Sequence, residues 1–336
     1  MDDSLKNKRS TTAHSGGIID PLTSGVADHP ASAVARPEAH RDGEWLVVTP
    51  GAALDLQQTE QRHSRMMEWL GQHVPVKLLG RLHSRGEIKV DGDVIRLRLF
   101  PDSEYGFVPT HDHLLQVLFE DEYVLVVHKP AGIAVHPSDP QDQRRTLAGA
   151  VAAYFENSNQ RCAVRHVHRL DDDTTGPVLY AKNEFALMLL DEQMRSKDIG
   201  RRYVALVQGK VDQRLHVIDE PIGKDRHHKQ RRRVSPGGQS AVTHVERIQP
   251  ASSASLVRLT LETGRTHQIR VHLSYVGHPL VGDTLYGGKA GILSRQALHG
   301  EQLEFVHPWT HENIIVQDPW PDDFKQAAQK LGLLQA

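Results

Sequence analysis

Several features that define common protein classes are scarce or missing in this sequence. Its 336 residues include a single cysteine, Cys162, which excludes an internal disulfide and an all-cysteine metal site. Aromatic residues make up only 5% of the chain, and no run of about 18 apolar residues exists that would predict a membrane span. The N-terminus lacks the apolar stretch of a signal peptide. Together these absences predict a cytoplasmic protein.

The net charge is also small, at −2 with the histidines neutral, which by itself argues weakly against nucleic-acid binding. The charges are distributed unevenly, however. Residues 195–233 contain 12 Lys or Arg against five Asp or Glu, a local excess of seven positive charges. One basic face on an otherwise acidic protein is the pattern expected where that face contacts phosphate, and a solvated loop of charges is the alternative.

The first part of the chain divides by composition. Residues 1–45 have few large apolar side chains to offset the entropy of ordering, which predicts a disordered tail. Within residues 46–108, apolar spacing predicts helices over 62–74 and 76–86. Alternation over 87–100, with an Asp-Gly turn, predicts a strand hairpin. The segment is therefore predicted to be a small α/β domain.

Residues 109–336 mix strands and helices without regular alternation. Strands are predicted on both sides of residues 120–122 and over 201–209, a buried helix over 184–196, and a strand, turn and helix over 255–277. No glycine-rich phosphate loop follows a strand, so a dinucleotide-binding sheet is not expected. The pattern favours an α+β domain.

The stretch HVHRLDDDTTG, which begins at His166, has three chemical interpretations. A metal site would use His166, His168 and Asp171, but the cation of Arg169 would lie beside the ion. The spacing Asp-x-Asp-x-Thr also matches the loop of haloacid-dehalogenase-type phosphatases, but the preceding residues are not the continuous apolar run of a buried strand. The third interpretation is a single reactive carboxylate on a loop, and an ordinary acidic turn is its structural alternative.

The surrounding motifs resemble one family. HRLDDDTTG resembles the signature of the RluA-type RNA pseudouridine synthases. RRYVALVQG, LETGRTHQIRVHLSYVGHPLVGDTLYGG and LHGEQLEFVHPWT follow in the order expected for that family, so the resemblance covers residues 114–324. The departures are Thr175, where serine is common, and His128, where asparagine usually stands. The predicted domain over 46–108 resembles the RNA-binding module first found in a small-subunit ribosomal protein, which often precedes such enzymes.

The resemblance implies an α+β pseudouridine synthase fold, with a mixed, largely antiparallel sheet, flanking helices and a central cleft. It implies an isomerase that converts uridines of structured RNA to pseudouridine, in ribosomal RNA or, alternatively, transfer RNA. No cofactor and no metal are expected, because the reaction is an isomerisation. RNA is the expected partner of a monomeric protein, without DNA or a membrane. A catalytically silent RNA-binding protein of the same fold is the alternative.

The same resemblance assigns roles to individual residues. Asp171 is the expected catalytic carboxylate, Arg265 its paired arginine and Tyr203 the residue that stacks on the target base. Asp172 and Asp173 are expected to be loop residues without a chemical role. Two residues are assigned to substrate binding around the extruded nucleotide, and four to the RNA phosphates: Arg169 and His168, then Lys224, Arg231, Arg232 and Arg233.

Overall fold

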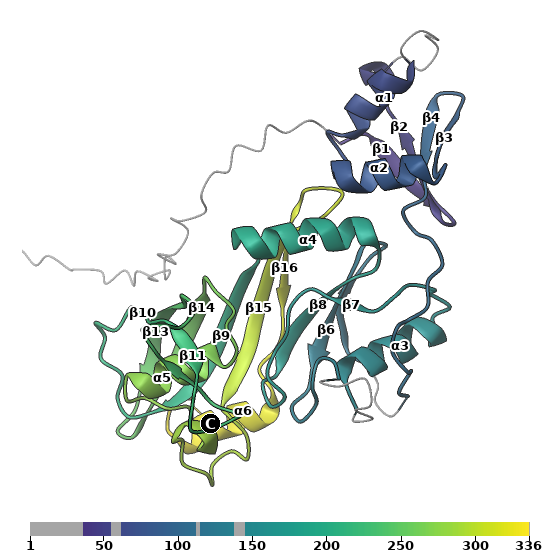
Figure 1. Cartoon of the computed structure of the whole chain (residues 1–336). Helices are drawn as coiled ribbons and strands as arrows, with labels where there is room; N and C mark the ends of the chain where they lie inside the picture. Colours follow the sequence, from purple (N-terminus) through teal and green to yellow (C-terminus); the bar gives the residue numbers. More distant parts are fainter. Residues whose placement is uncertain (1–35, 55–61, 112–114, 138–144, 336) are drawn as a thin grey trace, which may run out of the picture. The chain divides into compact units, whose positions relative to one another are not determined.

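The structure is a computed structural model that describes residues 36–54, 62–111, 115–137 and 145–335 (Figure 1). Residues 36–336 form one compact unit. The first part of the predicted tail, residues 1–35, lies outside the described residues. The elements are, in chain order, β1 (Glu38–Asp42), β2 (Trp45–Thr49), η1 (Gly51–Ala53), α1 (Arg62–Leu70), α2 (Val76–Ser84), β3 (Ile88–Asp91), β4 (Val94–Leu97), β5 (Val117–Glu120), β6 (Val124–Lys129), α3 (Leu147–Asn157), β7 (Arg165–His166), β8 (Gly176–Ala181), α4 (Glu184–Ser196), β9 (Gly200–Gln208), β10 (Val217–Asp219), β11 (Ile222–Lys224), β12 (Arg232–Val234), β13 (Val242–Pro250), β14 (Ala254–Leu261), α5 (Gln268–Tyr275), η2 (Thr284–Tyr286), β15 (Leu298–Val306), β16 (Asn313–Gln317) and α6 (Asp322–Lys330).

The N-terminal part contains an antiparallel sheet of four strands in the order β1-β2-β4-β3, with α1 and α2 packed against it. The helices and the hairpin predicted from sequence are confirmed as α1, α2, β3 and β4. The prediction of a disordered tail was wrong for residues 38–42, because these residues form β1. This edge strand exposes nearly all its side chains and is held by backbone pairing with β2, so its sequence carries no apolar signal.

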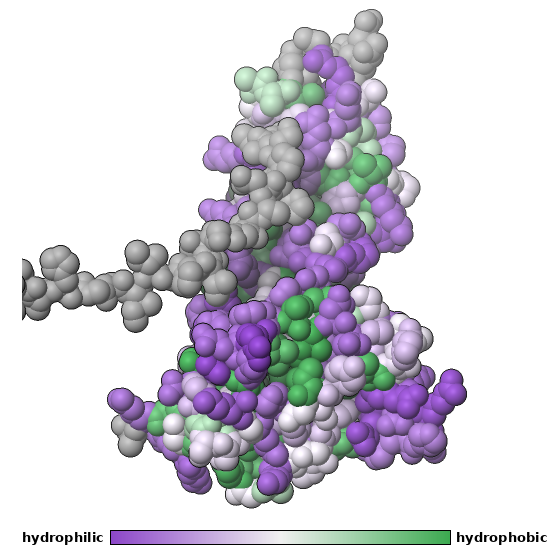
Figure 2. All heavy atoms as spheres, turned by 90° about the vertical axis from the view of Figure 1, so that its left-hand side faces the viewer, coloured by the Kyte–Doolittle hydropathy of each residue, from purple (hydrophilic) through white to green (hydrophobic). Residues whose placement is uncertain are grey.

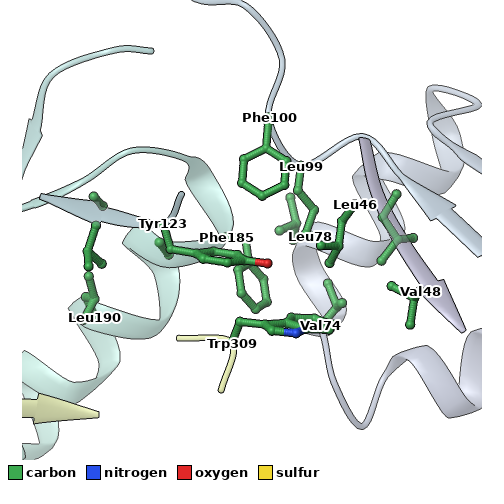
Figure 3. Close-up of a cluster of buried hydrophobic side chains, with 14 of the residues drawn as sticks. Leu46, Val48, Val74, Leu78, Leu99, Phe100, Tyr123, Phe185, Leu190 and Trp309 are labelled. Atoms are coloured by element: carbon green, nitrogen blue, oxygen red, sulfur yellow. The ribbon is translucent and has the colours of Figure 1, made fainter. Parts of the chain in front are cut away.

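One apolar cluster joins this small sheet to the rest of the unit (Figure 3). Leu46 and Leu99 of the N-terminal part share the cluster with Tyr123, Phe185 and Trp309. The Tyr123 and Trp309 rings stack with an interplanar angle of 3° and centroids 6.4 Å apart. Because aromatic side chains bury large areas, this cluster fixes the small sheet to its neighbours more firmly than a linker alone.

The next sheet also has four antiparallel strands, in the order β5-β6-β8-β7. Helix α3 covers one face of it with Leu147, Val151 and Phe155. Strand β8 is buried along its whole length, as expected for a central strand with both faces covered.

The largest sheet is antiparallel, with six strands in the order β10-β13-β14-β9-β15-β16. Side chains of β9 alternate between its two faces, as the pleat requires. Tyr203 and Ala205 pack on the side of α5, whereas Val204 and Leu206 pack on the side of α6. The predicted largely antiparallel fold with flanking helices is therefore confirmed.

The β5-β6-β8-β7 sheet and the six-stranded sheet meet where β8 begins. Thr175 forms an isolated parallel bridge with His299 of β15, and the Gly300 amide donates a hydrogen bond to the Thr175 carbonyl at 2.8 Å. Nearer the other end of β8 and β15, helix α4 packs against both strands, with Phe185 and Leu190 in one cluster with Leu179 of β8 and Leu303 of β15 (Figure 1). The junction matters for function because the loop that precedes β8 carries Asp171.

No helix among the described residues is long and apolar enough to cross a membrane. Figure 2 shows a largely hydrophilic surface on one side of the molecule, with apolar areas confined to patches.

Candidate active site

Asp171 lies between β7 and β8 in residues 167–175, which we call the Asp171 loop. Lys129, which is 0% exposed, points its ammonium group at the base of this loop. It donates hydrogen bonds to two carbonyls of the turn after β6 and to the carbonyl of Asp172, at 2.8, 2.7 and 2.5 Å. Burial lowers the pKa of Lys129 to about 8, against the opposing charges of the aspartates. Three carbonyls around one cation fix the backbone next to Asp171.

The other end of the Asp171 loop is held by the sheet junction. The Thr175 hydroxyl lies 2.9 Å from Nδ1 of the buried His299. Gly176 has a φ of 139°, and a Cβ there would lie 2.8 Å from the backbone of Gly300. Only glycine permits this close approach of two main chains. The loop is thus anchored both to the β5-β6-β8-β7 sheet and to the six-stranded sheet.

The Asp171 carboxylate is 24% exposed and is paired with an arginine from α5. Nη1 of Arg270 lies 3.2 Å from Asp171 Oδ2, and the same guanidinium makes a bidentate pair with Asp283 at 2.7 and 2.9 Å. Burial alone would lower the pKa of Arg270, but bonds to Asp283 and the charge of Asp171 outweigh it and raise this pKa. Asp283 holds the fork of Arg270 in place, and Arg270 in turn orients Asp171.

The prediction that Arg265 pairs with Asp171 was therefore wrong. Arg265 is exposed in the loop before α5, where its Nε donates to the Ser240 carbonyl at 2.9 Å. Both arginines belong to the motif TGRTHQIR, and the start of α5 at Gln268 decides which of them faces the carboxylate. Arg270 lies in the first turn of that helix and is buried, while Arg265 lines the rim of the same cleft.

Tyr203 lies where the sequence placed it, in the cleft beside Asp171. Its side chain is buried, and burial raises the pKa of the phenol, to which the charge of Asp171 also contributes while Arg201 opposes it. The phenol is therefore neutral at physiological pH, and its ring forms part of the cleft wall.

Two further residues beside Asp171 were not singled out from the sequence. His267 has a φ of 57°, a left-handed conformation, and its Nδ1 lies 2.8 Å from the Tyr286 hydroxyl. That hydroxyl accepts the Arg232 amide at 2.8 Å, and burial raises the pKa of Tyr286, so its proton is directed to His267 Nδ1. Burial also lowers the pKa of His267. The neutral ring then carries its proton on Nε2, which lies 3.9 Å from Asp171 Oδ2.

His168 and Arg169 occupy different environments. His168 is 6% exposed, and its Nε2 accepts the Leu179 amide at 3.3 Å. Burial, together with nearby positive charge, lowers the pKa of His168 to about 3, so its side chain is neutral. Arg169 is exposed at the cleft, with Nη1 3.4 Å from Nε2 of His136. Both predicted contacts around an extruded nucleotide line the cleft, Arg169 as an exposed cation and His168 as a largely buried neutral ring.

The predicted phosphate contacts lie on a hairpin of β11 and β12, residues 222–234, which we call the basic ribbon. Lys224 and Arg233 are exposed, and Arg232 is half-buried at the cleft. The Arg231 guanidinium carbon lies 5.4 Å from the centroid of the Tyr286 ring. The ribbon is therefore linked to the site through Tyr286, which also contacts His267.

These groups line a cleft of about 900 Å³, large enough for a nucleotide. Asp171, Tyr203 and Arg270 lie on its wall with His267 and Arg169. Among the described residues, no group of three His, Cys, Asp or Glu side chains is arranged to hold a metal ion.

Comparison with known proteins identifies the family. The sequence profile described as RNA pseudouridylate synthase matches residues 123–275, which include Asp171, Tyr203 and Arg270. The uncharacterized RNA pseudouridine synthase YhcT of Bacillus subtilis (strain 168) is 43% identical over 289 residues, 85% of this chain and 92% of that protein. The chain belongs to the RNA pseudouridine synthase family.

Within this family the chain is of the RluA type. A protein of Vibrio cholerae named ribosomal large subunit pseudouridine synthase D is 35% identical over 280 residues, 79% of this chain and 85% of that protein. The solved structure of human RNA pseudouridylate synthase domain containing 4 shares the fold, with a TM-score of 0.54 and 24% identity over 65% of this chain and 93% of that one. The protein is an isomerase that acts on RNA.

Proposed function

We propose that this pseudouridine synthase modifies a uridine of structured large-subunit ribosomal RNA. The name of the Vibrio cholerae relative supports this substrate class, and the basic ribbon beside the cleft is suited to folded RNA of any kind. Transfer RNA is the alternative substrate. The RNA substrate and the single cysteine support a cytoplasmic location, and a monomeric state is expected.

We assign the chemical role to Asp171. In the reaction the bond between sugar C1′ and uracil N1 breaks and a bond between C1′ and C5 forms, while C5 loses a proton and N1 gains one. A carboxylate at the cleft can act in this sequence as a nucleophile or as a base. The observation that carries the assignment is the Asp171–Arg270 pair at 3.2 Å, because Arg270 is itself held by Asp283.

The remaining roles follow from position in the cleft. Tyr203 offers a neutral aromatic ring for stacking on the target base. Arg169 is the exposed cation nearest in sequence to Asp171 and is suited to replace an extruded base in the RNA stack. The predicted N-terminal RNA-binding module remains an expectation, in which the small sheet with α1 and α2 would contact RNA outside the cleft.

Pseudouridine mapping tests the substrate. Total RNA from cells with and without the protein is compared site by site, and loss of pseudouridine at one or more positions of large-subunit ribosomal RNA is expected. Loss confined to transfer RNA would support the alternative substrate. Unchanged maps, with full RNA binding by the purified protein, would support a catalytically silent RNA-binding protein.

Asp171→Asn tests the catalytic assignment, because the amide keeps the shape of the carboxylate and removes its charge. Turnover should be abolished and RNA affinity should change little. Asp172→Asn and Asp173→Asn are matched controls, since both side chains are exposed and the carbonyl of each residue holds the loop. Each control should keep most activity. Wild-type turnover of the Asp171 variant would disprove the assignment.

A further inference from the structure

One buried cation in the cleft has no partner among the residues that the structure describes. Among the described residues, four Lys or Arg side chains are buried: Lys129, Arg201, Arg270 and Arg295. Lys129 meets three carbonyls, Arg270 meets two carboxylates, and Arg295 makes a bidentate pair with Asp323 at 2.8 and 2.9 Å. Arg201 is 8% exposed and, within the described part of the chain, makes no hydrogen bond or ion pair.

The fold directs Arg201 into the cleft. It lies on β9 two residues before Tyr203, so both side chains are on the same face of the strand, and both line the cleft. The guanidinium lies against the main chain of Gly264, where a Cβ would be 2.5 Å from Nη1. A glycine at this position leaves the space that the guanidinium occupies.

The described neighbours of Arg201 do not supply a counter-ion. Burial and the charge of Arg201 both keep His168 neutral by lowering its pKa, and burial keeps the Tyr203 phenol neutral by raising its pKa. The Asp171 carboxylate is already paired with Arg270. An arginine is always charged in a protein, and a buried cation without a partner destabilises the folded protein. Such a cost at a cleft wall is expected where a ligand supplies the missing anion.

We propose that Arg201 binds a phosphodiester group of the RNA strand next to the target uridine. The inference rests on the proposed function, because the ligand is the RNA that enters this cleft. Phosphates are the anionic groups of RNA, and the planar guanidinium can donate to two phosphate oxygens at once. A base carbonyl would satisfy one donor but leave the buried charge without an anion. Arg201 is thus a binding residue that positions the nucleotide over Asp171.

Arg201→Met in the full-length protein tests this role, with Arg202→Met as the matched control. Arg202 is the next residue of β9, on the opposite face, and its removal changes the net charge by the same amount outside the cleft. The probe is a transcript of large-subunit ribosomal RNA, whose Kd is measured by filter binding. Arg201→Met should weaken binding by about thirtyfold or more, and Arg202→Met much less. Arg201→Lys should be intermediate, since it keeps the charge but not the fork.

The melting temperature separates this role from a structural one. Methionine fills a similar volume without an unpaired charge, so the free Arg201→Met protein should melt at the wild-type temperature or a few degrees above it. A lower melting temperature with unchanged Kd would overturn the proposal and make Arg201 a structural residue. Equal losses of affinity in Arg201→Met and Arg202→Met would also overturn it, because a general charge effect would explain both.

RNAs in which one phosphodiester is replaced by an uncharged methylphosphonate identify the phosphate that Arg201 contacts. Short RNAs with one central uridine carry a methylphosphonate at one linkage at a time. At the contacted linkage the wild-type protein should lose as much affinity as Arg201→Met does, and the variant should lose little more. Independent losses at every linkage would contradict the contact. These measurements record binding, so failure to detect pseudouridine would refute the proposed function while the Kd and melting data still decide the role of Arg201.

Discussion

The Asp171 loop and the basic ribbon border the same cleft but are held in different ways. The loop is fixed by Lys129, by the sheet junction at Gly176 and, through Asp171 itself, by Arg270. The ribbon is held through its backbone, and in the described structure the side chains of Lys224, Arg232 and Arg233 donate no hydrogen bond. Catalysis depends on geometry to within a fraction of an ångström, whereas phosphate attraction depends mainly on charge within reach. The difference predicts that substitutions in the two regions have effects of different kinds.

The largest effect is expected at Arg270, which orients the loop carboxylate. Arg270→Gln removes the cation between Asp171 and Asp283 and should lower kcat by roughly a hundred- to a thousandfold. Arg265→Gln, at the exposed position in the same motif, should keep most of kcat. Single-turnover assays on saturating RNA measure both. If Arg265→Gln were the more damaging variant, the pairing seen in the free protein would not be the catalytic one.

Arg265 and Arg270 show which parts of the site can be predicted from the sequence and which cannot. Motif order identified the family and the fold and predicted Asp171 as the reactive residue, because all three calls rest on local patterns. The choice between Arg265 and Arg270 depends on where α5 begins and how its first turn faces the loop, which no one-dimensional pattern specifies. The burial of His168 also has no signal in the local pattern, since it depends on how the Asp171 loop packs against β8, where His168 accepts the Leu179 amide.

The N-terminal part shows the same limit. Its helices and hairpin have clear periodicity and were predicted, but β1 has exposed side chains and depends on pairing with β2. The aromatic cluster of Phe100, Tyr123 and Trp309 also joins distant segments. The predicted domain boundary at residue 108 therefore separates residues that share one hydrophobic core. Tertiary contacts of this kind have no signal in spacing or composition.

Glycine substitutions test the difference in rigidity between the Asp171 loop and the basic ribbon. Gly176→Ala would place a Cβ 2.8 Å from the Gly300 backbone at a positive φ, and should lower the free energy of unfolding by about 2–4 kcal/mol. Gly237→Ala, in the turn just beyond the ribbon, has no atom within 4 Å of the added carbon and should change it by less than about 0.5 kcal/mol. Urea denaturation measures both. Equal stabilities would show that the junction tolerates displacement.

Substitutions in the basic ribbon should change the salt dependence of RNA binding. Replacing Arg231, Arg232 and Arg233 by alanine removes a largely sequence-independent attraction, so RNA affinity should fall at low salt. The slope of log K against log salt should flatten by about 0.7 for each lost contact. The rate on saturating RNA should be nearly unchanged, because these side chains are assigned to binding. An unchanged slope would leave the run as a solvated charge cluster, and an unchanged slope with lost turnover would indicate a role in shaping the cleft.

The smallest effect is a pH dependence that separates the loop from the ribbon once more. Burial lowers the pKa of His168 to about 3 in the folded protein. As the pH falls below about 6.5, His168 is therefore protonated in the unfolded chain but stays neutral in the folded protein. His168 should therefore contribute a stability that is complete above pH 6.5 and is lost as the pH falls toward 3. Between pH 6.5 and 4.5 the loss should be about 2 kcal/mol.

His168→Gln can still accept the Leu179 amide but does not titrate, so its unfolding free energy should fall by about 2 kcal/mol less over the same range. His227→Gln, exposed in the turn of the basic ribbon, is the control and should follow the wild type. Denaturation curves at several pH values give the comparison. A wild-type slope in His168→Gln would mean that the folded protein accepts the proton. The expected result would make the Asp171 loop sensitive to acid through a buried neutral histidine, while RNA binding by the ribbon is sensitive to salt through exposed charge.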